Sequence, residues 1–469
     1  MNAPDATARG LLRSSSAATL AQVWRMALML ATNLLLRRLV GRDQWGLWDW
    51  AETVFLLLAA ARDLGLPTHV VRLSPPPWGN LLAVQLGWGA ILAGLTALAA
   101  PTIALAFESQ MPETVPVLRA LTLYLLCEGL ASVPMTFFER QLTIERSLLP
   151  ELARSLVYSG TVILLALDGM GVWAIVWAQV AASAVFALML WLRAWREIPL
   201  TWAHGRMLAL IREALPVGGV WLLVYAVTYA DRWILGARFP SERVGEYTFA
   251  YLYVFLASRM LQQPVGRALY PALVAFRGEP ARKLEAFRIG TLFLVGLEAP
   301  LAYILLCNAD LVTRLLGGSQ WVEAPTYFRA LAFVPVIDPL GRFGGELLIA
   351  LGRERLRIAS LLLNLAVLCG AGLWLTGLFG PVGKAWANYL PLGALLIGWA
   401  LWKLDPQVCG RLLRELGEVL LLPAPLFVAA WLLAPEGGWP RLGLSAAAAG
   451  LALAWFWWRF GRAFLSFFK

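Results

Sequence analysis

The chain contains 469 residues, of which 60% are hydrophobic and 14% are charged. Soluble domains average about 45–50% apolar and about 25% charged residues, so this composition excludes a disordered chain and argues against a soluble enzyme. The net charge of +10 would suggest nucleic acid as a partner of a soluble protein. In membrane proteins, however, Lys and Arg gather in cytoplasmic loops. We therefore expect an all-α polytopic membrane protein that does not bind nucleic acid.

Apolar segments long enough to cross a bilayer recur along the whole chain. A spanning helix needs about 20 mostly apolar residues, and about fourteen segments meet this requirement. The thirteenth is short and contains Pro423 and Pro425, and proline interrupts helices. In chain order the segments are Ala17–Leu36, Gly46–Leu66, Leu81–Phe107, Val115–Phe137, Leu149–Leu167, Val172–Leu192, Leu215–Leu235, Glu246–Leu269, Ile289–Leu306, Tyr327–Leu351, Ile358–Leu378, Val382–Leu401, Val419–Leu433 and Leu442–Trp458.

The distribution of positive charges predicts the orientation of these helices. With a cytoplasmic N-terminus, the loops on the cytoplasmic side carry sixteen Lys and Arg residues, and the loops on the other side carry eight. Cytoplasmic loops are enriched in these residues, so we expect both termini in the cytoplasm. Arg37, Arg38 and Arg42 depart from the rule, because this orientation places them outside.

Two segments that lie 199 residues apart resemble each other. Val40–Leu57 and Phe239–Leu256 each place a charged turn before a glycine, Gly46 or Gly245, and an aromatic-rich helix after it. A repeat offset by six helices predicts two halves with the same orientation, as in repeat-built transporters. Charged loops and aromatic belts that recur by chance are the alternative explanation. The expected regions are an N-lobe of residues 1–213, a C-lobe of residues 214–404 and two further helices in residues 405–469.

Charges inside the apolar segments are the candidate functional groups. A charge at the bilayer centre costs at least about 2.5–3.5 kcal/mol unless it faces water or a partner. Arg25 and Arg259 lie near mid-span, and neither has an acid three or four positions away. We expect them to line a water-filled cavity, or to pair with an acid of another helix such as Glu128 or Asp338. The planar fork of arginine suits phosphate, because it bonds two oxygens at once.

Further polar side chains share a helical face with these arginines. They are Gln22 and Asn33 beside Arg25 on the first segment, and Tyr251 and Gln262 beside Arg259 on the eighth. Aromatic rings on the Arg259 face of the eighth segment offer flat faces to sugar rings, or they pack against lipid and neighbouring helices.

Two more groups have either a structural or a binding role. Asp338, Arg342 and Glu346 occupy successive fourth positions of the tenth segment, so they can pair with one another along the helix. Arg62 has Asp63 beside it, but adjacent residues do not face each other on a helix.

Motifs of catalysis, nucleotide binding and metal binding are missing from the sequence. It contains no phosphate-binding loop, no Gly-x-Ser-x-Gly and no Gly-x-Gly-x-x-Gly that opens a helix. The four cysteines lie apart and the two histidines, His69 and His204, are distant, so neither type forms a metal-ligand pattern. We therefore expect no catalytic residue, no cofactor and no metal site.

Five longer stretches carry a family resemblance, which extends from Ser14 to about Leu404. They are Asn33–Arg72, Phe137–Ser155, Gly169–Val185, Thr228–Tyr251 and Ile349–Leu365. Together they resemble the oligosaccharide flippases (Wzx-like polysaccharide transporters) of the multidrug/oligosaccharidyl-lipid/polysaccharide exporter superfamily.

The resemblance implies two six-helix lobes around a central cavity in the cytoplasmic (inner) membrane. It implies that the protein moves a polyprenyl-diphosphate-linked oligosaccharide from the inner to the outer leaflet by alternating access, and that it is not an enzyme. The implied partners are this lipid-linked oligosaccharide, membrane lipids and polysaccharide assembly proteins. In a related group of lipid-linked-precursor flippases, arginines on the first, second and eighth helices line the cavity, and Arg25, Arg62 and Arg259 are the similar positions here.

Two other functions remain open. A multidrug or cation antiporter of the same superfamily would need an anionic cavity, whereas Arg25 and Arg259 favour a cationic one. A membrane glycosyltransferase or polymerase would need long outer loops, and the outer loops of this chain are short.

The expected orientation is tested with a reporter fused after Lys469. A reporter that works only in the cytoplasm should be active at this position, because the loop charges place the C-terminus inside. Alkaline phosphatase activity in the periplasm from the same fusion point would contradict the predicted topology.

Overall fold

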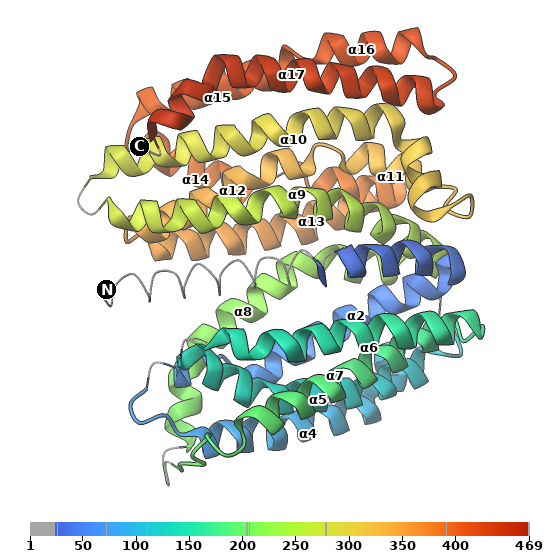
Figure 1. The fold of residues 1–469 in the computed structure, drawn as a ribbon, viewed down its shortest axis with the longest axis vertical. Helices are drawn as coiled ribbons and strands as arrows, with labels where there is room; N and C mark the ends of the chain where they lie inside the picture. Colours follow the sequence, from blue (N-terminus) through green and yellow to red (C-terminus); the bar gives the residue numbers. More distant parts are fainter. Residues whose placement is uncertain are drawn as a thin grey trace, which may run out of the picture. The chain divides into compact units, whose positions relative to one another are not determined.

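The computed structural model describes residues 24–467 except 26, 72, 110, 142, 203–204, 206, 277–278 and 391. All regular secondary structure in these residues is helical (Figure 1). The chain divides into two compact units, Met1–Gly245 and Glu246–Lys469, each with its own apolar core. The lobe boundary predicted after residue 213 concerns the membrane topology, and it stays a prediction.

The N-terminal unit (Met1–Gly245) consists of long helices around a core that includes Trp78, Phe137 and Leu190. Helix α5 packs against both α4 and α7, and α6 packs against α7 (Figure 1). After a helical stretch at residues 27–39, the elements are α2 (Arg42–Asp63), α3 (Leu66–Val70), α4 (Trp78–Ala104), α5 (Thr114–Arg140), the 3-10 turn η1 (Ile144–Ser147), α6 (Leu148–Leu167), α7 (Val172–Ala194) and α8 (Met207–Gly236).

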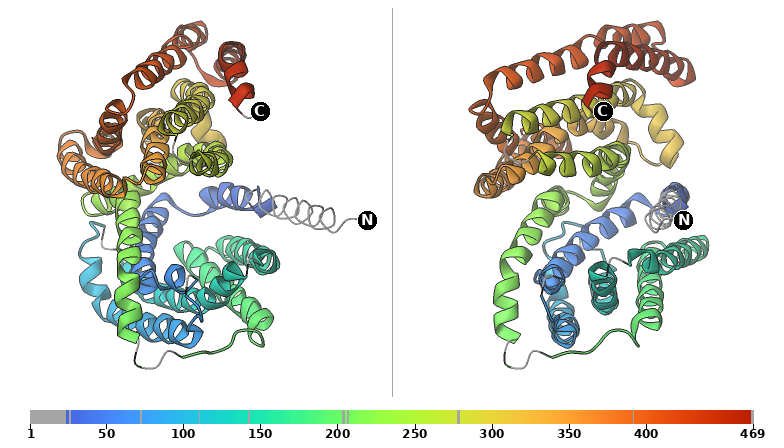
Figure 2. Two further views of the ribbon diagram at one scale, coloured as in Figure 1. Left: turned by 90° about the vertical axis from the view of Figure 1, so that its left-hand side faces the viewer. Right: turned by 60° about the vertical axis from the view of Figure 1, so that its left-hand side comes forward.

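The C-terminal unit (Glu246–Lys469) is assembled around α10, which packs against α11, α12, α15, α16 and α17 (Figure 2). Helices α15 and α17 belong to its core: the Tyr303 hydroxyl of α10 donates to the Leu420 carbonyl at 2.6 Å, and Phe456 of α17 packs against Gly296. The elements are α9 (Ser241–Ala275), α10 (Pro280–Gly317), α11 (Ala324–Leu331), α12 (Val334–Ala350), α13 (Glu354–Ala387), α14 (Leu392–Trp402), α15 (Pro406–Leu421), α16 (Ala424–Leu433) and α17 (Gly438–Phe467).

The helices confirm the predicted fold class, a polytopic all-α membrane protein. Within the described residues, eight helical stretches are long and apolar enough to cross a membrane. The tenth predicted segment is divided between α11 and α12. The gap predicted between the eleventh and twelfth is a kink inside α13, where Gly380 has φ 62°. The first predicted segment begins outside the described residues.

Two glycines allow the starts of α2 and α9 to touch. A Cβ atom on Gly46 would lie 1.8 Å from the Ser241 carbonyl oxygen, and one on Gly245 would lie 2.1 Å from the Arg42 carbonyl oxygen. Backbone atoms therefore approach more closely here than any side chain would allow. These are the glycines of the predicted repeat, so the two similar turns meet directly within the N-terminal unit.

This contact is tested by Gly46→Ala, with Gly87→Ala as the control. The added methyl of Gly46→Ala meets backbone, so the helices must separate, and overpacking of this kind costs about 1–3 kcal/mol. Nothing lies within 4 Å of a Cβ on Gly87, so the control should keep the stability. Thermal unfolding of both purified variants measures the effect, and equal melting temperatures would contradict the close approach.

Candidate functional site

Arg25 reaches from the first helical stretch to α6. Its Nη1 donates to Oε2 of Glu151, and Oε1 of Glu151 accepts a hydrogen bond of 3.1 Å from the Ser147 hydroxyl. The Arg25 side chain is 35% exposed and that of Glu151 22%, so a second anion can approach the pair. The expectation of Glu128 as the partner is wrong, because Glu128 pairs with Arg154 at 2.8 Å.

A polar network around Glu128 links α5, α6 and α7. Oε1 of Glu128 accepts a hydrogen bond of 2.8 Å from Ser183 in addition to the ion pair with Arg154. The Tyr124 hydroxyl accepts from Arg154 at 3.4 Å and from Gln179 at 3.2 Å. Each of these polar groups therefore finds a partner inside an otherwise apolar bundle, which such groups need in a membrane.

Arg62 is buried, at 4% exposure, and its guanidinium braces two helices. It donates to Oδ1 of Asp63 at 2.7 and 3.1 Å and to the Leu125 carbonyl of α5 at 2.8 Å. The expectation that adjacent residues cannot pair is wrong here, because Asp63 is the last residue of α2 and lies where the helix ends. The predicted role of Arg62 in substrate binding stays a prediction, and the geometry favours a structural role.

Arg37 shows why one part of the sequence departs from the charge rule for loops. Its guanidinium lies 3.7 Å from the centre of the Trp45 ring, its Nη2 lies 3.9 Å from Oδ2 of Asp49, and the residue is 1% exposed. It is therefore an internal group and not a loop charge. A second internal pair, Glu52 with Arg232 at 2.8 Å, joins α2 to α8.

A buried polar cluster occupies the C-terminal unit, where α9, α10 and α12 meet. Glu298 is 3% exposed and accepts hydrogen bonds from the Ser258 hydroxyl at 2.5 Å and from Nε2 of Gln262 at 3.1 Å. Oε1 of Gln262 accepts from Nη1 of Arg342 at 3.2 Å. The structure thus brings the predicted Gln262 and Arg342 together. Sequence reasoning missed Glu298, although an acid in the middle of the ninth apolar segment is itself a signal.

Asp338 lies beside this cluster, in the electrostatic field of three arginines: Arg342, Arg259 and Arg357. The predicted pairing along α12 is weak, since Nε of Arg342 lies 4.0 Å from Oε1 of Glu346. Arg259 itself is exposed within the unit and forms no ion pair in the part of the chain that the structure describes. Its guanidinium is accordingly accessible to an anion.

The remaining predicted site residues have simpler surroundings. The Tyr251 ring stacks against Tyr247 and Phe255, with ring centres 6.2 and 4.2 Å away, so the aromatic stripe of α9 is continuous. Nδ2 of Asn33 donates to the backbone carbonyl four residues earlier in its own helix, at 2.9 Å. Gln22 lies outside the described residues.

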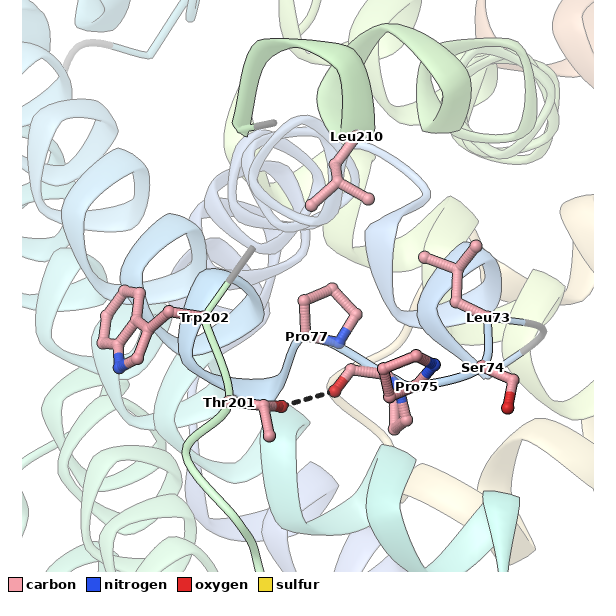
Figure 3. A pocket seen from close by; sticks show the side chains of 8 residues that line it. Leu73, Ser74, Pro75, Pro77, Thr201, Trp202 and Leu210 are labelled. Carbon is pink, nitrogen blue, oxygen red and sulfur yellow. Dashed lines mark hydrogen bonds between the residues drawn. The ribbon is translucent and has the colours of Figure 1, made fainter. Parts of the chain in front are cut away.

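A cavity of about 230 Å³ lies away from these groups, at the proline-rich turn between α3 and α4 (Figure 3). Its wall is mainly apolar, and the Thr201 hydroxyl closes one side by donating to the Pro76 carbonyl at 2.6 Å. None of the candidate arginines lines it. Among the described residues, no group of three or more His, Cys, Asp or Glu side chains is arranged to hold a metal.

An exposed ion pair lies outside the apolar segments, where Arg146 of η1 meets Glu197 after α7. The two nitrogens of Arg146 lie 2.6 and 2.7 Å from the two oxygens of Glu197. These hydrogen bonds lower the pKa of the Glu197 carboxyl below its ordinary value. Arg146 therefore holds its carboxylate in the two-pronged geometry that arginine also offers to phosphate.

The bracing role of Arg62 predicts the outcome of Arg62→Ala. The variant leaves the Leu125 carbonyl without this donor, and an unsatisfied buried acceptor costs about 1–3 kcal/mol. Asp63 is 40% exposed, so the loss of its partner adds little. The purified variant should unfold at a lower temperature, whereas Arg355→Ala, which removes an exposed arginine, should not change the melting temperature. Unaltered unfolding of Arg62→Ala together with lost transport would instead identify Arg62 as a binding residue.

Sequence comparison relates the chain to proteins of polysaccharide assembly. The family model described as "Polysaccharide biosynthesis protein" matches residues 14–326. The succinoglycan biosynthesis transport protein ExoT of Rhizobium meliloti (strain 1021) is 22% identical over 330 residues, which cover 68% of this chain. The matched region spans only 65% of the length of that relative.

Structural comparison identifies the fold. The lipid II flippase MurJ, in its inward closed conformation, superposes with a TM-score of 0.75 at 13% identity, and the match covers 95% of this chain and 99% of that one. An inward-facing multidrug resistance MATE family transporter has a TM-score of 0.62 at 16% identity, covering 83% of this chain and 96% of that one. At these identities the likeness concerns the fold alone.

Proposed function

The chain belongs to the polysaccharide biosynthesis protein family, and on this premise we propose that it is a flippase for a lipid-linked oligosaccharide. The substrate moves from the inner to the outer leaflet of the cytoplasmic membrane, and a polyprenyl diphosphate joins the glycan to its lipid. The transport relative and the flippase fold support this proposal. Both termini lie in the cytoplasm, and the partners are membrane lipids and polysaccharide assembly proteins.

The observation that carries the proposal is an accessible arginine in each unit. Arg25 has a partly exposed guanidinium, and Arg259 is exposed. An accessible guanidinium inside a membrane protein can take up an anion, because each anionic partner stabilises a charge in an apolar surrounding. Its fork matches the oxygens of a diphosphate. Binding is reversible charge pairing, so the reaction needs no nucleophile and no general base.

The polar residues near these arginines suit the rest of the substrate. On α9, Tyr251 offers a ring face to sugar rings, while the buried Gln262 holds Arg342 at 3.2 Å and so positions the polar cluster beside it. Asn33 lies two helical turns from Arg25 on the first helical stretch. The lipid tail stays in the bilayer, and the two lobes open alternately to either side, as in other repeat-built transporters. The anion must not be held too tightly, or its release would stall.

A cation or drug antiporter is the second candidate. The buried acid Glu298 and the neighbouring Asp338 favour it, because acids inside a bundle can exchange cations. The drug-transporter fold of MATE proteins is also similar to that of this chain. An antiporter predicts that the chain confers drug resistance, and that Glu298→Gln removes it.

The arginine proposal is tested by Arg25→Ala and Arg259→Ala in a strain that lacks its own flippase. Each variant should reduce surface glycan at least tenfold while the protein still inserts, because each removes one guanidinium from the diphosphate. Lys at either position should restore export only in part, since it keeps the charge but loses the fork. Arg355→Ala, at an exposed arginine, is the control.

Wild-type levels of surface glycan in both alanine variants would overturn the proposed role of these arginines. Normal glycan export combined with lost drug resistance in Glu298→Gln would favour the antiporter.

A further inference from the structure

The contact between the first helical stretch and α6 has a buried part and an open part. In the buried part, the Thr32 hydroxyl donates to the Ser159 hydroxyl at 2.8 Å. In the open part, about two helical turns away, Arg25 pairs with Glu151. Ser147, one turn before Glu151, donates to its other carboxylate oxygen at 3.1 Å. The carboxylate is therefore held in place in front of Arg25.

The exposure of Arg25 separates it from Arg62 and Arg37, which lie deep in the same unit. Its side chain is 35% exposed, against 5% for Arg62 and 2% for Arg37. Those two brace helices, and an incoming ligand cannot reach them without unfolding. The Arg25–Glu151 pair is accessible, so another anion can take the place of Glu151 without disturbing the buried contact.

We infer that Glu151 is an internal competitor of the substrate, which occupies Arg25 in the empty protein and is displaced when the diphosphate binds. The inference rests on the proposed function, in which Arg25 holds this diphosphate. A carboxylate and a phosphate oxygen use the same guanidinium fork. Coulomb attraction grows with the charge of the ligand. A diphosphate carries more negative charge than one carboxylate, so it displaces Glu151 more effectively than a monophosphate does.

The same competition assists release. When the substrate leaves on the far side of the membrane, Glu151 pairs with Arg25 again, and the arginine never has to remain uncompensated in an apolar surrounding. Glu151 is thus a positioning residue, although it need not touch the substrate. Removing its charge should make binding tighter and turnover slower, whereas removing a merely structural ion pair should make binding weaker or leave it unchanged.

The test measures binding to the purified full chain in detergent, with geranylgeranyl diphosphate and geranylgeranyl monophosphate as probes. Glu151→Gln should bind the diphosphate at least threefold more tightly. The monophosphate should gain affinity by a similar factor, because a resident anion that either ligand must displace lowers both affinities alike. Glu197→Gln is the matched control: it removes the carboxylate from another arginine pair of the same unit, outside the apolar helices, and should bind both probes as the wild type does.

One further variant and a measurement in cells keep the result decisive. Glu151→Asp retains the charge but withdraws it by one methylene group, so its affinity should lie between wild type and Glu151→Gln. It replaces Glu151→Gln if thermal unfolding shows that the glutamine variant is misfolded. In cells, Glu151→Gln should lower the substrate level needed for half-maximal export and also lower the maximal rate.

Arg25→Ala distinguishes the competitor role of Glu151 from the proposed function on which it rests. Lost diphosphate binding in Arg25→Ala, with unchanged or weaker binding in Glu151→Gln, overturns the competitor role and leaves the proposed function intact. Wild-type binding in Arg25→Ala overturns both.

Discussion

A charge inside an apolar helix must find either a partner or water, and the packing of each unit follows from this requirement. Arg62 and Arg37 satisfy it internally, with carboxylates, a carbonyl and an aromatic ring, and they tie helices together. Arg25 and Arg259 are more exposed: the Arg25 side chain is 35% exposed even in its pair with Glu151, and Arg259 is exposed. The difference between bracing and binding arginines is therefore one of burial, since the chemical group is the same in all four.

Transport imposes a second condition, because a site that binds an anion must also release it. A guanidinium that exchanges one anionic partner for another is never left bare, so neither binding nor release meets a large electrostatic barrier. The N-terminal unit offers this exchange through Glu151. In the C-terminal unit Asp338 stands in the electrostatic field of Arg342 and Arg259. The cluster around Glu298 holds α9, α10 and α12 in the positions that create it.

The helices were predictable from the sequence, and their partners were not. A long apolar run has essentially one stable form in a bilayer, so segment length locates the helices; the break near Gly380 was also expected. Arg25 pairs with a residue 126 positions away, and helical periodicity carries no information about how two helices are rotated against each other. The pairing of Asp63 with Arg62 was not predicted, because the geometry of a regular helix does not hold at the end of α2. Glu298 was overlooked because it stands alone in its segment.

Movement of the lipid-linked glycan itself tests the central claim most directly. Liposomes can be prepared with the purified protein and a polyprenyl-diphosphate-linked oligosaccharide in the inner leaflet, with a lectin outside to detect its arrival. The account predicts that lectin access rises faster than in protein-free liposomes, and faster for the diphosphate-linked glycan than for the same glycan on a monophosphate carrier. Equal rates with and without protein, or equal rates for the two linkages, would contradict it.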